Sequence, residues 1–110
     1  MIKGIGTDIV EISRLGKSSE KLAQRILTKN EQAHPKANTI AFLAKRFAAK
    51  EAISKAYGTG IGAELSFQDI EIANDSKGKP IASIKGKDLT IHLSIADEKN
   101  YAVAYAIIED

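Results

Sequence analysis

The sequence predicts an α+β fold in which an antiparallel sheet packs on a long central helix, within a single domain over residues 1–110. Three observations predict it: a β-branched segment opens the chain, an alanine-rich helical segment occupies the middle, and short alternating apolar segments fill the second half. A length of 110 residues allows one compact domain and is too short for two ordinary ones.

The first half begins with a strand, expected over residues 2–10. Its glycines, Gly4 and Gly6, are typical of a strand that another backbone or a ligand approaches closely. A helical pattern follows over residues 14–29, interrupted early by glycine and serine, and Ser19 is expected to cap its second part.

The clearest helix is expected over residues 40–57, after a loop at residues 30–38. Alanines favour the helix, and Gly58 suits a left-handed cap at its C-terminal end. Apolar side chains surround most of its circumference, which indicates a helix buried on several sides. Its charged side chains must then meet ion pairs, a metal or a polyanionic ligand, because an unpaired buried charge is very costly.

The second half is expected to form an antiparallel meander of four strands, over residues 67–72, 81–84, 89–96 and 101–108. In the last strand, large residues at alternate positions oppose a row of alanines. Small residues on that second face indicate a helix packed closely across it.

Composition excludes several classes of protein. There is no cysteine, so disulfide scaffolds, thiolate metal sites and cysteine nucleophiles are excluded. No apolar run is long enough to span a membrane and no secretory signal is recognised, so a cytoplasmic location is expected. A net charge of +2 and 5% aromatic residues disfavour a nucleic-acid-binding module, which needs a basic surface with stacking aromatic side chains.

The residues with the chemistry of a site are Asp8, Glu51 and Lys55. Glu51 and Lys55 stand four residues apart, which suits either an intrahelical ion pair or a cation ligand beside a phosphate contact. Asp8 is either a second ligand or a turn or cap residue. Mg²⁺ commonly takes one or two protein carboxylates and fills its other positions with water and phosphate oxygens.

Three other features have two interpretations each. The glycine turn at residues 58–62 either stops the helix or contacts an anion, although the helix dipole disfavours phosphate at this end. His92 is either a hydrogen-bonded structural residue or part of a site. A basic stripe is either a solvated face or a docking surface for an acidic partner. That stripe consists of Arg14, Lys17, Lys21 and Arg25.

Four blocks resemble the holo-acyl-carrier-protein synthase family, the small bacterial type of 4′-phosphopantetheinyl transferase. The blocks are residues 4–11 (GIGTDIVE), 25–28 (RILT), 42–61 (FLAKRFAAKEA through KAYGTGI), and 69–72 (DIEI) together with GKP at 78–80. The resemblance spans nearly the whole chain. It implies that fold, a homotrimer with active sites between subunits, and Mg²⁺-dependent transfer of 4′-phosphopantetheine from coenzyme A to a serine of apo acyl carrier protein.

The resemblance also implies residue roles. Asp8 and Glu51 match the magnesium ligands, and Lys55 matches a catalytic lysine near the pyrophosphate. The coenzyme A-binding positions matched are Arg46, Lys55, Gly58, Thr59, Gly60, Gly78, Pro80 and His92. Because acyl carrier proteins are acidic, Arg14, Lys21 and Arg25 become candidates for docking the carrier.

One departure from the family affects the general base. Many members carry a second histidine five positions after the first, where this chain has Asp97. The base is therefore either Asp97 or a metal-bound water or hydroxide. The same replacement supports an alternative function, a non-catalytic trimeric adaptor that binds acyl carrier protein or coenzyme A without transfer.

Overall fold

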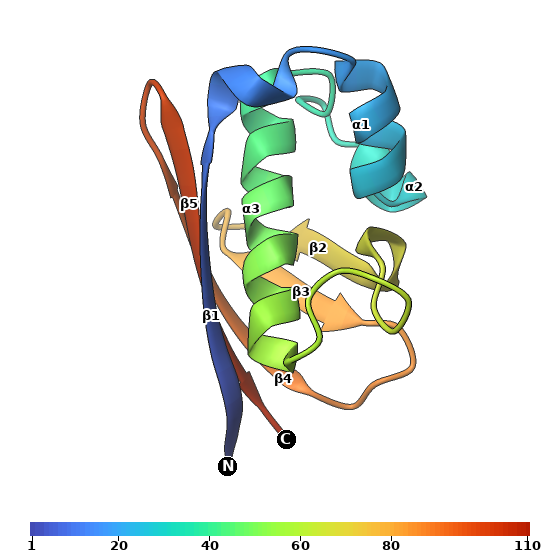
Figure 1. Ribbon diagram of the computed structural model, residues 1–110, viewed down its shortest axis with the longest axis vertical. Coiled ribbons are helices and arrows are strands. Elements are labelled where there is room, and N and C mark those ends of the chain that lie inside the picture. Colours follow the sequence, from blue (N-terminus) through green and yellow to red (C-terminus); the bar gives the residue numbers. More distant parts are fainter.

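The computed structural model describes residues 1–110, which form a sheet, one long helix and a smaller layer of short elements (Figure 1). The helices are α1 (Ser19–Ile26), α2 (Lys29–Gln32) and α3 (Ile40–Tyr57), with 3₁₀ helices at Ile12–Leu15 and Phe67–Asp69. The strands are β1 (Ile2–Glu11), β2 (Ile70–Asn74), β3 (Pro80–Ile84), β4 (Thr90–Asp97) and β5 (Tyr101–Glu109). No helix has the length and apolar character needed to cross a membrane.

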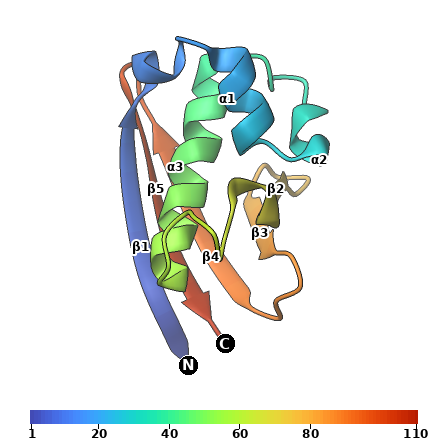
Figure 2. The same cartoon turned by 45° about the vertical axis from the view of Figure 1, so that its right-hand side comes forward.

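The helix α3 lies between the main sheet on one side and α1 and α2 on the other (Figures 1 and 2). It has the predicted bounds, and Gly58 ends it in the left-handed conformation at φ 104°. The alanines of β5 (Ala102, Ala104 and Ala106) are buried, as the small-residue face predicted. Eleven of the eighteen residues of α3 are buried, including Lys50.

The close approach predicted for the first strand is confirmed between β1 and α3. A Cβ atom added at Gly6 would lie 2.1 Å from the carbonyl oxygen of Ala52, and one at Gly4 would lie 2.0 Å from that of Ala56. Only residues without a side chain allow the two backbones to approach this closely. The contact fixes the position of Asp8, two residues further along the strand, against the C-terminal half of the helix.

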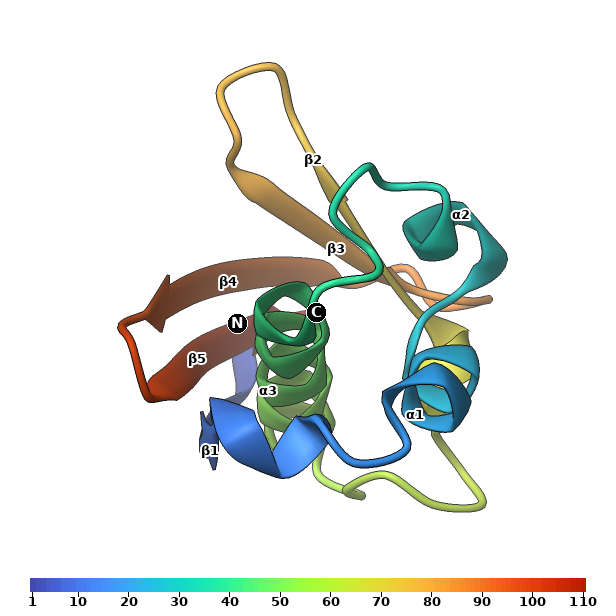
Figure 3. The same cartoon turned by 90° about the horizontal axis from the view of Figure 1, so that it is seen from above.

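The predicted single meander is wrong, because the strands divide into two sheets. The main sheet has the antiparallel order β1-β5-β4, and β2 pairs only with β3. The chain turns away after β3: Gly86 adopts φ 73°, and the Lys85 N–H donates to the carbonyl of Asp69. Seen from above, the β2–β3 hairpin projects away from the main sheet (Figure 3).

The helix predicted over residues 14–29 is also wrong in extent. A 3₁₀ helix ends at Leu15, and α1 begins at Ser19 after Ser18, which has a positive φ of 58° and makes no side-chain cap hydrogen bond. Ser19 is thus the first helical residue and not the cap. The proposed stripe therefore does not lie on one helix face, since only Lys21 and Arg25 belong to α1.

The loop expected over residues 30–38 contains part of α2. Thr28 and Glu31 form a capping box: the Glu31 N–H donates to Thr28 Oγ1, and the Thr28 N–H donates to Glu31 Oε1. The sequence pattern Thr-x-x-Glu is the usual signature of this motif. Because α2 buries Glu31, this short helix also supplies an unexpected charge to the core.

Candidate functional site

Asp8 and Lys55 meet where β1 crosses α3. Lys55 Nζ lies 3.1 Å from Asp8 Oδ1 and also donates a 2.9 Å hydrogen bond to the carbonyl of Thr7. The expected alternative, an ion pair between Glu51 and Lys55, is not formed, because the lysine reaches the strand instead. The lysine side chain remains half exposed, so its ammonium is accessible to an anionic ligand.

Glu51 completes the acidic pair beside this lysine. Partial burial raises the pKa of Glu51, and the nearby negative charge of Asp8 raises it further. Lys55 and Arg25 oppose the shift to a smaller degree. Two carboxylates that repel one another in a partly desolvated position are stabilised by a cation between them, so this donor set fits a hard divalent ion.

No three acidic or histidine side chains are arranged so that they could hold a metal ion together, so phosphate oxygens and water would have to complete the coordination at the acidic pair. The glycine turn follows directly after the helix, three residues beyond Lys55. Gly58 and Gly60 have positive φ values, and both of their N–H groups donate to the carbonyl of Ser54. The turn therefore ends the helix, as one of the two interpretations predicted, and leaves Thr59 exposed beside it.

A small apolar cavity of about 330 Å³ opens beside Glu51. Its lining includes the apolar side chains of Leu22, Phe47 and Ile61 and the charged groups of Arg25 and Glu51. The Arg25 guanidinium also lies 5.7 Å from the ring centre of Phe67. This largely apolar cavity therefore contacts one member of the acidic pair, Glu51, and includes one cationic side chain, Arg25.

A second group of predicted residues gathers around Arg46, which lies about 140° around α3 from Glu51. Arg46, Gly78, Pro80 and Asp97 line one cavity of about 380 Å³, together with Asn74 and others. The Lys45 ammonium lies 4.0 Å from the Asp97 carboxylate. No ion pair or hydrogen bond joins this group to the acidic pair within one chain.

The Arg46 guanidinium is held by three neighbours. Its ζ-carbon lies 4.6 Å from the centre of the Phe42 ring, and one terminal nitrogen donates a 3.1 Å hydrogen bond to Asn74 Oδ1. Its Nε atom is buried, has no hydrogen-bond partner, and lies 3.9 Å from Glu31 Oε2. Desolvation by burial lowers the pKa of Arg46, and the negative charges of Glu31 and Glu71 oppose that effect.

Sequence reasoning missed Glu31, the partner of the most deeply buried cation. Lys50 is completely buried, and its Nζ donates to Glu31 Oε1 at 2.7 Å and to the carbonyls of Ile26 and Phe67. All three donors of the ammonium are therefore satisfied. The expectation that the charges of this helix need partners is confirmed, although the capping box was the only signal that pointed to residue 31.

The structure places His92 neither at the acidic pair nor in the cavity that Arg46 and Asp97 line. It lies on the outward face of β4, where Nε2 is 2.6 Å from Glu109 Oε1. The same face of the main sheet exposes apolar side chains from β1 and β5. They are Ile5, Ile9, Tyr101, Val103 and Tyr105.

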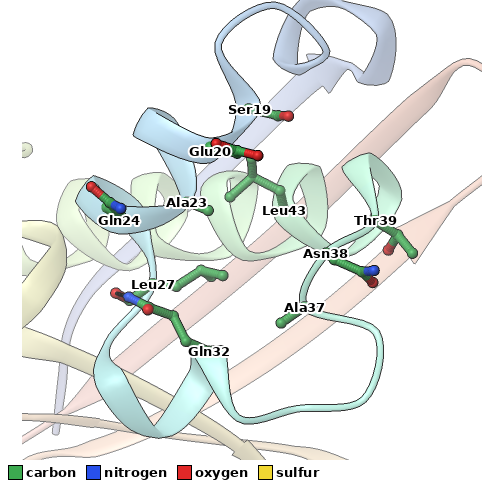
Figure 4. Close-up of a pocket in the computed structure, with 10 residues that line it drawn as sticks. All are labelled: Ser19, Glu20, Ala23, Gln24, Leu27, Gln32, Ala37, Asn38, Thr39 and Leu43. Carbon is green, nitrogen blue, oxygen red and sulfur yellow. Dashed lines mark hydrogen bonds between the residues drawn. The ribbon is translucent and has the colours of Figure 1, made fainter.

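The docking candidates are all exposed but lie on different segments. Arg14 belongs to the first 3₁₀ helix, whereas Lys21 and Arg25 lie on α1. A further cavity of about 400 Å³ lies between α1 and the start of α3 (Figure 4). Leu27 and Leu43 contribute apolar surface to it, and no residue predicted for the site lines it.

Comparison with known proteins gives consistent results. Residues 4–106 match the 4′-phosphopantetheinyl transferase superfamily. A holo-[acyl-carrier-protein] synthase of Bacillus pumilus is 56% identical over 117 aligned residues, which cover 99% of this chain and 97% of that protein.

Solved structures agree with this result. The structure of a holo-(acyl-carrier-protein) synthase of Bacillus anthracis in complex with CoA (3′,5′-ADP) superimposes with a TM-score of 0.90 at 50% identity, covering 98% of this chain and 96% of that one. The Helicobacter pylori holo-[acyl-carrier-protein] synthase in complex with coenzyme A superimposes with a TM-score of 0.85 at 32% identity, covering 96% and 99%.

Proposed function

The chain belongs to the 4′-phosphopantetheinyl transferase superfamily, and on that premise we propose that it converts apo acyl carrier protein to its holo form for fatty acid biosynthesis. The reaction moves the 4′-phosphopantetheine arm of coenzyme A to a serine of the carrier and releases adenosine 3′,5′-bisphosphate. The observation that supports it most strongly is the convergence of Asp8, Glu51 and Lys55 where β1 packs on α3. Phosphoryl transfer requires such positioned charges around a diphosphate.

The acidic pair is the proposed magnesium site. Asp8 and Glu51 would supply two oxygen ligands, and substrate phosphates and water would complete the coordination. A divalent ion held there would neutralise negative charge on the diphosphate as the bond to the leaving group breaks. The raised pKa of Glu51 fits this assignment, because partial burial and the nearby charge of Asp8 both disfavour the ionised carboxylate, which a divalent ion would stabilise.

Lys55 would hold the diphosphate. Its exposed ammonium can contact a phosphate oxygen while Thr7 and Asp8 fix its position. In the transfer, the seryl oxygen forms a bond to phosphorus, the bond to adenosine 3′,5′-bisphosphate breaks, and the hydroxyl proton passes to a base. Asp97 is the proposed base, with its partly exposed carboxylate beside Lys45.

The nucleotide end of coenzyme A is assigned to the second cavity, where Arg46 and Lys45 provide positive charge. Gly78 and Pro80 border that cavity without adding bulk. Within one chain the second cavity and the acidic pair lie on different sides of α3. We therefore propose a homotrimer in which one subunit supplies the acidic pair, with its glycine turn Gly58–Gly60, and its neighbour supplies the nucleotide cavity and Asp97.

The exposed apolar face of the main sheet supports this assembly. A patch that includes Ile9, Val103 and Tyr105 is unusual on an isolated chain and is typical of an interface between subunits. His92 lies at the edge of the same face, so its proposed contact with the coenzyme requires a neighbouring copy.

The proposed carrier surface is the exposed side of α1 and the preceding turn, with Arg14, Lys21 and Arg25 as its cations. The apolar cavity between Arg25 and Glu51 would accept an apolar side chain of the carrier next to its serine. Charge complementarity of this kind raises the association rate and weakens with salt. We propose a cytoplasmic location for this reaction.

Intact-mass analysis tests the proposal. Apo acyl carrier protein incubated with the enzyme, coenzyme A and Mg²⁺ should gain one phosphopantetheine group per molecule. The Asp8→Asn and Glu51→Gln variants should remain folded and give little product. An unmodified carrier with the wild-type protein would refute transfer and favour the adaptor, and equal activity of both variants at saturating Mg²⁺ would refute the ligand assignment.

A further inference from the structure

The buried carboxylate of Glu31 lies next to Arg46, the arginine that lines the second cavity. Glu31 is 3% exposed, and Lys50 is completely buried beside it. One oxygen of the carboxylate accepts from Lys50 Nζ at 2.7 Å and from the Thr28 N–H at 2.8 Å. The other oxygen accepts from the Ile72 N–H at 2.8 Å. The carboxylate is therefore fixed from α2, α3 and β2 at once.

The free side of this carboxylate faces Arg46. The oxygen that accepts from Ile72 is also the one 3.9 Å from the buried Nε of Arg46. That Nε has no other partner, whereas the far end of the guanidinium reaches the cavity wall at Asn74. The arginine is thus held between a fixed anion behind it and the Phe42 ring beside it.

We propose that Glu31 is a positioning residue for the coenzyme: it orients the Arg46 guanidinium so that its terminal nitrogens face the second cavity. This inference rests on the proposed function, in which that cavity takes the nucleotide end of coenzyme A. Lys50 has the supporting role, because its ammonium balances the Glu31 charge and leaves Arg46 with a net positive charge to offer a ligand.

The charge arrangement explains why a carboxylate is needed there. An arginine free to change its conformation must be immobilised when the ligand binds, which costs up to about tenfold in affinity for one long side chain. A fixed negative charge at Nε immobilises it beforehand. A neutral amide at position 31 keeps only one of the two oxygens that accept from Lys50 and Ile72, and it would not attract the guanidinium by charge.

The test is a double-mutant cycle on the binding of adenosine 3′,5′-bisphosphate, measured by calorimetry on the full chain. We expect Glu31→Gln to bind about 3- to 10-fold more weakly than the wild type, and Arg46→Ala to bind more weakly still. The double variant should bind no more weakly than Arg46→Ala alone, because Glu31 acts only through the arginine. A merely structural role would add its loss to that of the arginine.

Glu71→Gln is the matched control. Glu71 belongs to the same network, accepting a 2.6 Å hydrogen bond from Thr28 Oγ1, but its charge acts on Arg46 only at longer range, without an ion pair. Its substitution should leave the affinity within about twofold of wild type. If Glu31→Gln leaves an unpaired lysine and fails to fold, Glu31→Gln/Lys50→Met removes both buried charges and takes its place in the cycle.

Unchanged affinity of the Glu31 variant, additive losses, or normal binding by Arg46→Ala would overturn the inference. If the wild type transfers phosphopantetheine and any of these results is found, only the positioning role of Glu31 is refuted and the proposed function stands. If the wild-type protein neither binds the nucleotide nor modifies the carrier, the proposed function itself fails.

Discussion

Substitution of Gly6 by alanine should separate the strand and the helix that form the acidic pair. The added Cβ would lie 2.1 Å from the carbonyl oxygen of Ala52, 2.7 Å from the backbone nitrogen of Ala56 and 2.9 Å from Lys55 Cβ. A carbon and an oxygen in contact need about 3.3 Å, so β1 must retreat by about 1 Å. The two closest clashes are with backbone atoms, so a change of side-chain conformation cannot relieve them.

The expected cost has a structural and a functional part. Overpacking of this kind lowers the free energy of unfolding by about 1–3 kcal/mol, which corresponds to a fall in Tm on the order of 5–15 °C. Because the displaced strand carries Asp8, a misplacement of about 1 Å should also lower kcat about 100-fold at a temperature where the variant is folded.

Thermal unfolding and the intact-mass assay, run well below the Tm of the variant, measure the two parts separately. Gly62→Ala is the matched control, because no atom lies within 4 Å of its added Cβ and its φ is not positive. Wild-type Tm and wild-type activity of Gly6→Ala would refute the close contact as the feature that positions the pair.

Four further changes test other parts of the structure. Since the folded-state pKa of Glu51 is raised above its ordinary 4.5, the metal-free protein should lose stability as the pH rises from 4.5 through the raised value, and Glu51→Gln should abolish that decline in urea titrations. Lys50→Ala leaves a buried carboxylate unpaired and should lower the free energy of unfolding by about 3–5 kcal/mol, measured by the same titration; a loss below 1 kcal/mol would argue against the buried pair. Val103→Lys places a charge on the exposed apolar face and should yield monomers in analytical ultracentrifugation, where an unchanged sedimentation coefficient would contradict the proposed interface. Lys21→Glu should raise the KM for the carrier, most at low salt, without changing that for coenzyme A, and the opposite pattern would argue against the docking surface.

Local patterns predicted the elements that depend on local chemistry. The alanine-rich segment and Gly58 gave the bounds of α3, and the alanines of β5 identified the face that the helix covers. The two glycines of β1 predicted the close approach of another backbone or a ligand, and the structure shows that the backbone of α3 makes it. Each of these features follows from the size or conformational freedom of a residue, which the sequence states directly.

The features that could not be predicted depend on choices between distant partners. The sequence spacing suggested Glu51 as the ion-pair partner of Lys55. Only the packing of β1 against the helix selects Asp8 instead. Glu31 is 19 residues from Lys50, so nothing in the local pattern joined them. The division of the sheet depends on how the chain turns at Gly86, a position that a continuous meander would also accommodate.

A crystal structure of the protein grown with coenzyme A and Mn²⁺ in place of Mg²⁺ tests the central claim most directly. Anomalous scattering locates the manganese ion without reference to the surrounding atoms. We expect one strong peak within coordination distance of the carboxylates of both Asp8 and Glu51 and of the diphosphate, about 2.0–2.2 Å from each oxygen. A peak that touches the diphosphate but neither carboxylate, or no peak beside the acidic pair, would contradict the account.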